Sequence, residues 1–167
     1  MNEKSPKMIA AGKKAAVTLK QRKIVQKAAR TARWAKIMTR WLATKASGGI
    51  KWQRVDFSGP SGSESRGIVD ILAIRKDHST PPGGLKRGDL FETILFQIKG
   101  GTAPWPTMGD IDRLRRVARH HRAKYVVLAE WKKGKQPTLF TLKRAPNRDE
   151  GRRSSWTETT SVNELLA

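Results

Sequence analysis

The sequence contains no cysteine, so the chain can form neither a disulfide nor a thiolate zinc site. No apolar stretch approaches the roughly 20 residues that a membrane-spanning helix requires, and no apolar signal-peptide segment follows the N-terminal lysines. Acidic residues are scarce at the start, where Glu3 is the only one before Asp56. These absences argue against a disulfide-stabilised secreted protein or a membrane protein, and they favour a cytoplasmic one.

The charge of the chain is its most pronounced compositional feature. Lys and Arg number 35 against 14 Asp and Glu, which gives a formal net charge of +21 over 167 residues. An excess of this size favours a polyanionic partner, because neutralising phosphates releases bound counterions. Nucleic acid is the first candidate partner, and an anionic membrane surface is a poor second.

Two apolar runs of strand length, at residues 67–74 and 94–99, carry polar residues that a purely structural core strand would not need. Side chains alternate between the faces of a strand, so Gln97 and Lys99 are expected to share one face. If the two runs are antiparallel neighbours in a sheet, Asp70 can lie beside both. The sequence therefore predicts a carboxylate, an amide oxygen and an ammonium in one small patch.

Such a patch has a recognisable chemistry. Carboxylate and amide oxygens are hard ligands suited to Mg²⁺ (or Mn²⁺). A lysine beside the ion can stabilise the negative charge that builds up on an attacked phosphate. In a strongly basic chain, Asp70, Gln97 and Lys99 thus predict hydrolysis of phosphodiester bonds. The alternative is an Asp at a strand entrance and a surface-facing Gln and Lys on an edge strand.

At these residues the sequence resembles the PD-(D/E)XK nuclease superfamily. Asp70 matches the Asp of the family pattern and Lys99 its lysine, while Gln97 stands where most members have an acid. The Gly/Ser-rich loop at residues 62–67 is similar to the one that precedes the Asp in archaeal Holliday junction resolvases. The resemblance covers roughly residues 31–143. It implies a three-layer α/β/α sandwich around a mixed sheet, and a metal-dependent DNA endonuclease, resolvase-like or transposon-type.

The resemblance also implies a metal site, and this sequence departs from the family pattern at one of its ligands. Asp70 and Gln97 would ligate the metal, and the backbone carbonyl of Ile98 would add a third oxygen. In relatives the first helix often supplies a Glu, but no acid lies between Glu3 and Asp56 here, and Glu64 is the available substitute. Because Gln97 is neutral, we expect weaker metal affinity than that of an Asp–Glu site.

The chain divides by composition into three parts: a basic arm at residues 1–30, helical or disordered, a nuclease-like domain at 31–143, and a polar tail at 144–167 with a short terminal helix. Within the domain, the pattern predicts a helix that begins with Thr31 as N-cap. Its predicted buried stripe is Trp34, Ile37, Met38, Trp41 and Leu42, and its predicted outer face carries Arg33, Lys36 and Arg40.

A second amphipathic helix is predicted after residues 104–106, with Thr107 or Asp110 as cap. Its predicted buried stripe is Ile111, Leu114, Val117 and Ala118. The predicted element order is helix, three strands, helix and two strands. We expect the nucleic acid to be bound by Ser63, Ser65 and Arg66 of the Gly/Ser-rich loop, by Arg113, Arg116 and Arg119 of the second helix, and by Lys36 and Arg40 of the first.

Three functions remain open on the sequence alone. The first is the endonuclease, acting on DNA that includes branched forms, with a homodimer as a plausible assembly because cutting two strands commonly needs two sites. The second is a catalytically silent nucleic-acid-binding module of the same fold, favoured by the missing helix acid and by Gln97. The third is a small basic RNA-binding structural protein, which fits the composition equally well.

Overall fold

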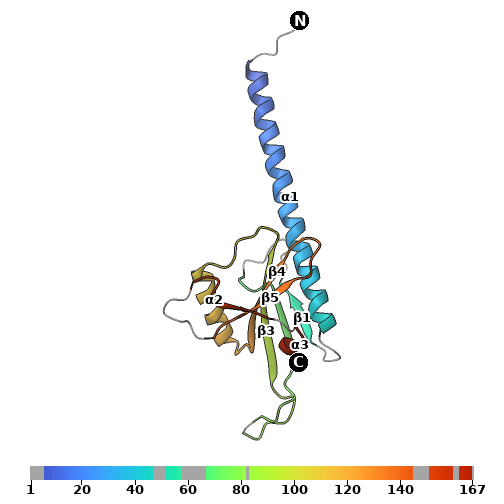
Figure 1. Cartoon of the computed structure of the whole chain (residues 1–167), viewed down its shortest axis with the longest axis vertical. Helices are drawn as coiled ribbons and strands as arrows, with labels where there is room; N and C mark the ends of the chain where they lie inside the picture. The colour runs from blue at the N-terminus through green and yellow to red at the C-terminus, as the bar shows by residue number, and fades with distance from the viewer. Residues whose placement is uncertain are drawn as a thin grey trace.

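The computed structural model describes residues 6–46, 52–57, 67–81, 83–144, 151–159 and 162–166. The elements in chain order are α1 (Pro6–Ala46), β1 (Gln53–Asp56), β2 (Ile71–Lys76), β3 (Phe91–Gly100), α2 (Met108–His120), β4 (Tyr125–Trp131), β5 (Thr138–Leu142), β6 (Trp156–Glu158) and α3 (Val162–Leu166). Figure 1 shows α1 running past the sheet, with its N-terminal half projecting beyond the rest of the chain.

The six strands form one mixed sheet in the order of the sequence, β1 to β6. Neighbours are antiparallel except β3 and β4, which are parallel and are connected through α2. The predicted antiparallel pairing of the strands that follow Asp70 and contain Gln97 is confirmed, with Ile71 opposite Phe96. The result is an α/β architecture that follows the predicted element order and adds a sixth strand.

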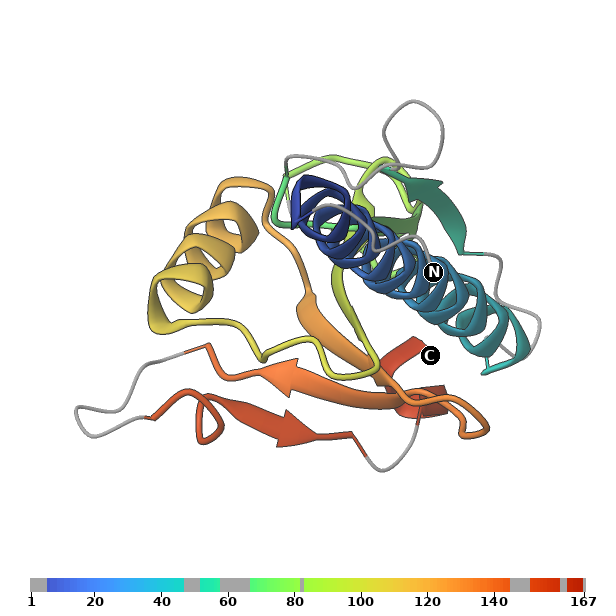
Figure 2. The ribbon, with the colours of Figure 1, turned by 90° about the horizontal axis from the view of Figure 1, so that it is seen from above.

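Alternate residues of β3 and β4 point into two separate cores, one on each face of the sheet. Ile94 and Phe96 pack with Ala43 of α1, whereas Leu95 packs with Ile111 and Leu114 of α2. Because successive side chains of a strand project to opposite faces, α1 and α2 cover opposite faces. Viewed from above, β3 and β4 run between the two helices (Figure 2).

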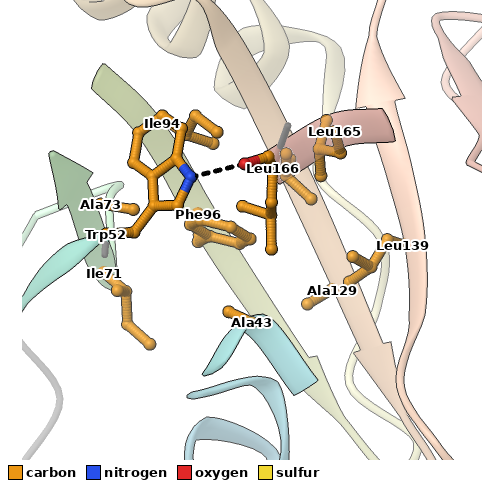
Figure 3. Close-up of a cluster of buried hydrophobic side chains, with 11 residues drawn as sticks. Ala43, Trp52, Ile71, Ala73, Ile94, Phe96, Ala129, Leu139, Leu165 and Leu166 are labelled. Atoms are coloured by element: carbon orange, nitrogen blue, oxygen red, sulfur yellow. Dashed lines mark hydrogen bonds between the residues drawn. The ribbon is translucent and has the colours of Figure 1, made fainter. Parts of the chain in front are cut away.

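The terminal helix α3 closes the core on the α1 side. Leu165 and Leu166 are buried among residues of β2, β3 and β4 (Figure 3). The carbonyl of Leu166 accepts a hydrogen bond of 2.7 Å from the indole nitrogen of Trp52, which lies just before β1. This bond satisfies the only polar atom of a buried tryptophan side chain and ties the C-terminal helix to the first strand. The short terminal helix predicted from sequence is confirmed.

The predicted start of the first helix at Thr31 is wrong. Thr31 lies inside the continuous helix α1, and its hydroxyl donates to the carbonyl of Lys27, one turn earlier, at 2.9 Å. The long run of Ala, Lys, Gln and Arg before it favours helix, so no break is required at residue 30. Every side chain described from Val17 to Arg30 is exposed. The division into a basic arm and a domain stays a prediction.

The predicted buried stripe of α1 is also wrong for its largest members. Trp34, Ile37 and Trp41 are 49%, 38% and 42% exposed, and only Met38 and Leu42 of that set are partly buried. The face of α1 that meets the sheet consists instead of small residues, namely Ala35, Thr39 and Ala43. These follow one another at spacings of four and so form one line along the helix.

Glycine on β3 explains why small residues are needed there. A Cβ atom added to Gly100 would lie 3.0 Å from the Cβ of Ala35 and 3.1 Å from the carbonyl oxygen of Thr31. The backbone of α1 therefore lies almost against the end of β3, with no room for a tryptophan between them. Gly101, at φ +67°, then turns the chain away in a conformation that favours glycine.

Helix α2 agrees with its prediction. Thr107 is the N-cap, its hydroxyl accepts from the Asp110 amide, and the Asp110 carboxylate accepts from the Thr107 amide. Ile111 and Leu114 are fully buried, while Val117 and Ala118 pack partly buried against the same cluster.

The strands differ from the sequence prediction in their bounds. β2 begins at Ile71, four residues after the predicted start at residue 67, and β3 begins at Phe91 and ends at Gly100. The sequence prediction missed β6, within a segment expected to be irregular. Within the described part of the chain, no helix combines the length and hydropathy needed to span a bilayer.

Candidate functional site

Asp70 is held in place by β3 at the entrance of β2. Its amide donates to the carbonyl of Phe96 at 2.8 Å, and its Oδ2 accepts from the amide of Ile98 at 2.7 Å. A carboxylate thus takes the place of a backbone carbonyl as the acceptor for one amide of the strand. This short bond to a charged acceptor fixes the carboxylate at the backbone of β3.

Ile98 is the residue between Gln97 and Lys99, so the Asp70 carboxylate contacts the backbone of that segment. The N–H and C=O of one strand residue point toward the same side. The Ile98 carbonyl is therefore directed toward the same edge as its amide, where the Asp70 carboxylate lies. Whether the side chains of Gln97 and Lys99 also meet Asp70 stays a prediction.

Gln97 is buried, with 7% of its surface exposed, and lies on the face of β3 that α2 covers. Its side-chain oxygen Oε1 has no hydrogen-bond partner among the described residues. A buried amide oxygen without a partner is costly, by about 1–3 kcal/mol. Such an oxygen lacks the partner that a buried amide ordinarily has, which is compatible with a ligand at this position.

Lys99 shares the face of Gln97, two residues further along β3. It is paired in register with Glu130 on the parallel strand β4, so the two side chains project from the same face of neighbouring strands. The Glu130 carboxylate accepts from the indole nitrogen of Trp105 at 3.2 Å and lies 3.7 Å from Lys132 Nζ. An acid thus flanks Lys99 that the sequence analysis did not single out.

The start of α2 also lies within electrostatic reach of Lys99. Hydrogen bonds from the Thr107 hydroxyl and amide lower the pKa of the Asp110 carboxyl, and the positive charge of Lys99 adds to this shift. Gln97 and Lys99 therefore lie on the side of the sheet that α2 covers.

Lys36 reaches from α1 to the carboxylate of Asp70. Its Nζ lies 3.7 Å from Oδ1 of Asp70 and 3.9 Å from Oδ1 of Asp56, and its side chain is only 13% exposed. The prediction that Lys36 lies on the outer face of its helix is therefore wrong. The first helix thus places an ammonium beside Asp70.

The other predicted nucleic-acid contacts are distributed over separate surfaces. Arg40 is largely exposed on α1 and donates to Oδ2 of Asp56 at 3.3 Å. Arg113, Arg116 and Arg119 are exposed on α2. Ser63, Glu64, Ser65 and Arg66 lie outside the described residues.

Three groups at the start of β2 and on β3 have the chemistry that an oxygen-preferring divalent cation requires. They are the Asp70 carboxylate, the carbonyl of Ile98 and the buried oxygen of Gln97, and their convergence on one ion stays a prediction. Within the described part of the chain, no group of three or more His, Cys, Asp or Glu could hold a metal. Any ion here would be held by a single carboxylate and neutral oxygens, with the Lys36 ammonium nearby to oppose it.

Sequence reasoning missed Asp56, Glu130 and the inward direction of Lys36. Asp56 ends β1 directly opposite Ile71, which follows Asp70. Glu130 ends the apolar run of β4 at the edge where β3 also ends. An acid immediately after an apolar strand was a usable signal, because the carboxyl ends of parallel neighbours lie at one edge of a sheet.

A second charged cluster, at the other end of β3, is structural. Burial raises the pKa of Glu92, but its hydrogen bonds with Lys124 and Arg75 outweigh that effect and the net shift is downward. Arg75 also stacks on Trp52, with 4.6 Å to the ring centroid. These contacts give Glu92 a structural role.

No protein-family model matches the chain, and no curated protein matches it in sequence. Among solved structures, the Holliday junction resolvase Hjc of Archaeoglobus fulgidus is similar at 16% identity and a TM-score of 0.40, over 75% of this chain and 94% of the resolvase. The function proposed below is supported by the contacts within this chain.

Proposed function

We propose that the chain is a divalent-metal-dependent endonuclease that hydrolyses phosphodiester bonds of DNA, including branched DNA, on a three-layer fold of the PD-(D/E)XK type. The single observation that carries the proposal is the bond between the Asp70 carboxylate and the Ile98 amide, at the residue between Gln97 and Lys99. It brings two residues that are 28 positions apart in the sequence into contact.

The proposed roles follow from the chemistry of each group. Asp70, the Gln97 oxygen and the Ile98 carbonyl would hold Mg²⁺ or Mn²⁺, which when bound supplies Lewis-acid activation of the scissile phosphate. Lys99 would stabilise the charge that develops on the phosphate oxygens. In the net reaction, water forms a new P–O bond, the bond to the leaving oxygen breaks, and that oxygen gains a proton.

The charges around Asp70 set the expected metal affinity. A neutral Gln97 contributes no charge, and the ammonium of Lys36 lies 3.7 Å from the carboxylate. Both features oppose a cation at Asp70, so the site is expected to bind metal weakly and to load at high metal concentration. Glu64, in the neighbouring Gly/Ser-rich loop, stays a proposed additional ligand.

Cleavage is tested on a four-way DNA junction and on supercoiled plasmid with Mg²⁺ or Mn²⁺. Asp70→Asn keeps an oxygen acceptor for the Ile98 amide, and Lys99→Met keeps most of the side-chain volume. We expect each to reduce the cleavage rate by about 100-fold or more, with unchanged DNA binding in EDTA. Lys133→Met, on the exposed turn after β4, is the matched control and should cleave normally.

Metal binding gives a readout besides activity. Titration of Mn²⁺ followed by electron paramagnetic resonance should show weaker binding for Asp70→Asn and tighter binding for Gln97→Glu, by about tenfold each, because one negative charge is removed or added.

The same experiments separate the second candidate function. A catalytically silent DNA-binding module is favoured by the ammonium of Lys36 beside Asp70. Tight DNA binding by the wild-type chain, with no nicking at any metal concentration and no response of Mn²⁺ binding to Asp70→Asn, would replace the nuclease by that module. Preference for structured RNA over DNA would favour an RNA-binding structural protein.

A further inference from the structure

The outward side of α1 carries a continuous stripe that the proposed active site does not use. Its members are Lys20, Lys23, Lys27, Arg30, Trp34, Ile37 and Trp41, which follow one another at alternating spacings of three and four and so share one side of a helix. All seven side chains are exposed. We call this set the outer stripe of α1.

The position of the outer stripe follows from the buried residues of the same helix. Ala35 and Thr39 face the sheet, and at 100° per residue Trp34 and Trp41 point away from it. Three large apolar side chains between 38% and 49% exposed, in line on one helix, are more than scattered surface residues. The basic half of the stripe lies on the part of α1 that projects beyond the sheet (Figure 1).

The charge of the helix decides between occupants. Every charged residue of α1 is Lys or Arg. A second copy of α1 would bring cationic positions of one helix close to those of another, without any acid on either helix to compensate them. A coiled coil needs apolar residues along the whole of such a stripe, and here the first four positions are cations.

A single nucleic-acid strand offers both chemistries that the stripe presents. Its phosphates are anions along a line, and its unpaired bases are flat apolar surfaces. Tryptophan provides a stacking platform for any base, and neighbouring Lys and Arg neutralise the backbone. From Lys20 to Trp41 the stripe is about 30 Å long, at 1.5 Å per residue, which is enough for several nucleotides.

We propose that the outer stripe of α1 binds single-stranded or unpaired nucleic acid, with Trp34 and Trp41 stacking on bases and the four cations contacting phosphates. The inference takes from the proposed function only that the partner is nucleic acid, and it requires neither metal nor cleavage. It assigns to the exposed tryptophans a role that duplex binding would not need.

The test measures the binding of fluorescein-labelled oligo-dT to the full chain in EDTA, by anisotropy. Trp34→Ala/Trp41→Ala should weaken binding by about 30-fold or more, since two base–aromatic stacks are lost and each contributes about 1–3 kcal/mol. Trp34→Phe/Trp41→Phe should restore most of the affinity. Phe91→Ala removes an aromatic that is 60% exposed on β3, outside the stripe, and should leave binding unchanged.

Two further measurements assign the parts of the stripe. An abasic oligonucleotide of equal length should bind the wild-type chain about as weakly as oligo-dT binds the tryptophan double variant, and the double variant should not distinguish the two. Lys23→Gln/Lys27→Gln should reduce the dependence of binding on salt, whereas the tryptophan variants should not.

Equal binding of oligo-dT by wild type and Trp34→Ala/Trp41→Ala would overturn the proposal. So would a wild-type dimer in sedimentation that the same substitutions dissociate, because the stripe would then be a protein interface. Circular dichroism checks that the variants fold. Absence of nuclease activity bears on the proposed active site alone, because this binding is measured without metal.

Discussion

The two long helices cover opposite faces of one sheet by opposite means. α2 places large side chains inward, with Ile111 and Leu114 fully buried, and Arg113, Arg116 and Arg119 outside. α1 places small residues inward and its tryptophans outside, because Gly100 lets its backbone approach the end of β3 closely. A hydrophobic stripe in the sequence therefore predicts a helix with one apolar side. Whether that side packs against the sheet depends on how closely the sheet lets the helix approach.

Truncation of the large apolar residues should show the greatest difference between the two helices. Leu114→Ala leaves a cavity under α2 and should lower the free energy of unfolding by about 2–5 kcal/mol. Trp34→Ala removes a larger side chain from the exposed side of α1 and should change it by no more than about 0.5 kcal/mol. Urea denaturation of the two variants measures both values. A large loss in Trp34→Ala would mean that this tryptophan packs inside.

Replacing a glycine by alanine should change the free energy of unfolding in opposite directions beside α1 and within α2. Gly100→Ala brings a Cβ atom to 3.0 Å from the Cβ of Ala35 and 3.1 Å from the Thr31 carbonyl. Because the helix backbone must shift, we expect the free energy of unfolding to fall by about 1–3 kcal/mol.

Gly109→Ala in α2 is the matched control. Its added Cβ would meet nothing closer than the Thr107 hydroxyl at 3.9 Å, and alanine favours the helical state. We expect the free energy of unfolding to rise by about 0.5–1 kcal/mol. Thermal denaturation of both variants compares them directly, and equal losses would argue against close approach of α1 as the cause.

Removing the capping pair at the start of α2 should destabilise the chain less than Leu114→Ala, and by an amount that depends on pH. Thr107→Ala should cost about 1 kcal/mol at neutral pH. The folded-state pKa of Asp110 is lowered below 3.8 by its hydrogen bonds with Thr107. Its stabilisation is therefore complete above that value and is lost as the pH falls through the lower folded-state pKa.

Urea midpoints at pH 7 and at pH 3 or below measure this dependence. The difference in urea midpoint between Asp110→Asn and the wild type should become smaller as the pH falls, because the wild-type carboxyl then becomes neutral as well. A difference that grows on acidification would show that Asp110 is not stabilised as a carboxylate.

Much of the architecture could be predicted from local patterns. Strands β3 and β4 were predicted from the apolar runs before Lys99 and at residues 125–129. The start of α2 was predicted from the capping residues Thr107 and Asp110. β6 was not predictable, because Trp156 is the only buried apolar residue of a three-residue strand in a polar segment. The orientation of α1 was not predictable either, since it depends on a contact with a glycine more than fifty residues away.

The candidate site was predictable in its strand residues and unpredictable in its helix residues. Strand alternation correctly gave Gln97 and Lys99 one face, and the antiparallel pairing brought Asp70 to Ile98. The approach of Lys36 to Asp70 could not be inferred, because the predicted stripe turned the helix the wrong way. Glu130 was marked by its position after the apolar run of residues 125–129, but its pairing with Lys99 depended on the register between β3 and β4, which no local pattern encodes.

One continuous helix carries both the exposed cations from Lys20 to Arg30 and the Lys36 ammonium that lies 3.7 Å from the Asp70 carboxylate. Between these two groups, Thr31 and Ala35 lie against Gly100 at the end of β3. The glycine that lets the helix approach the sheet so closely therefore also fixes the distance between a basic surface and the carboxylate of the candidate site, so a larger residue at position 100 would change the charge environment of Asp70 as well as the packing.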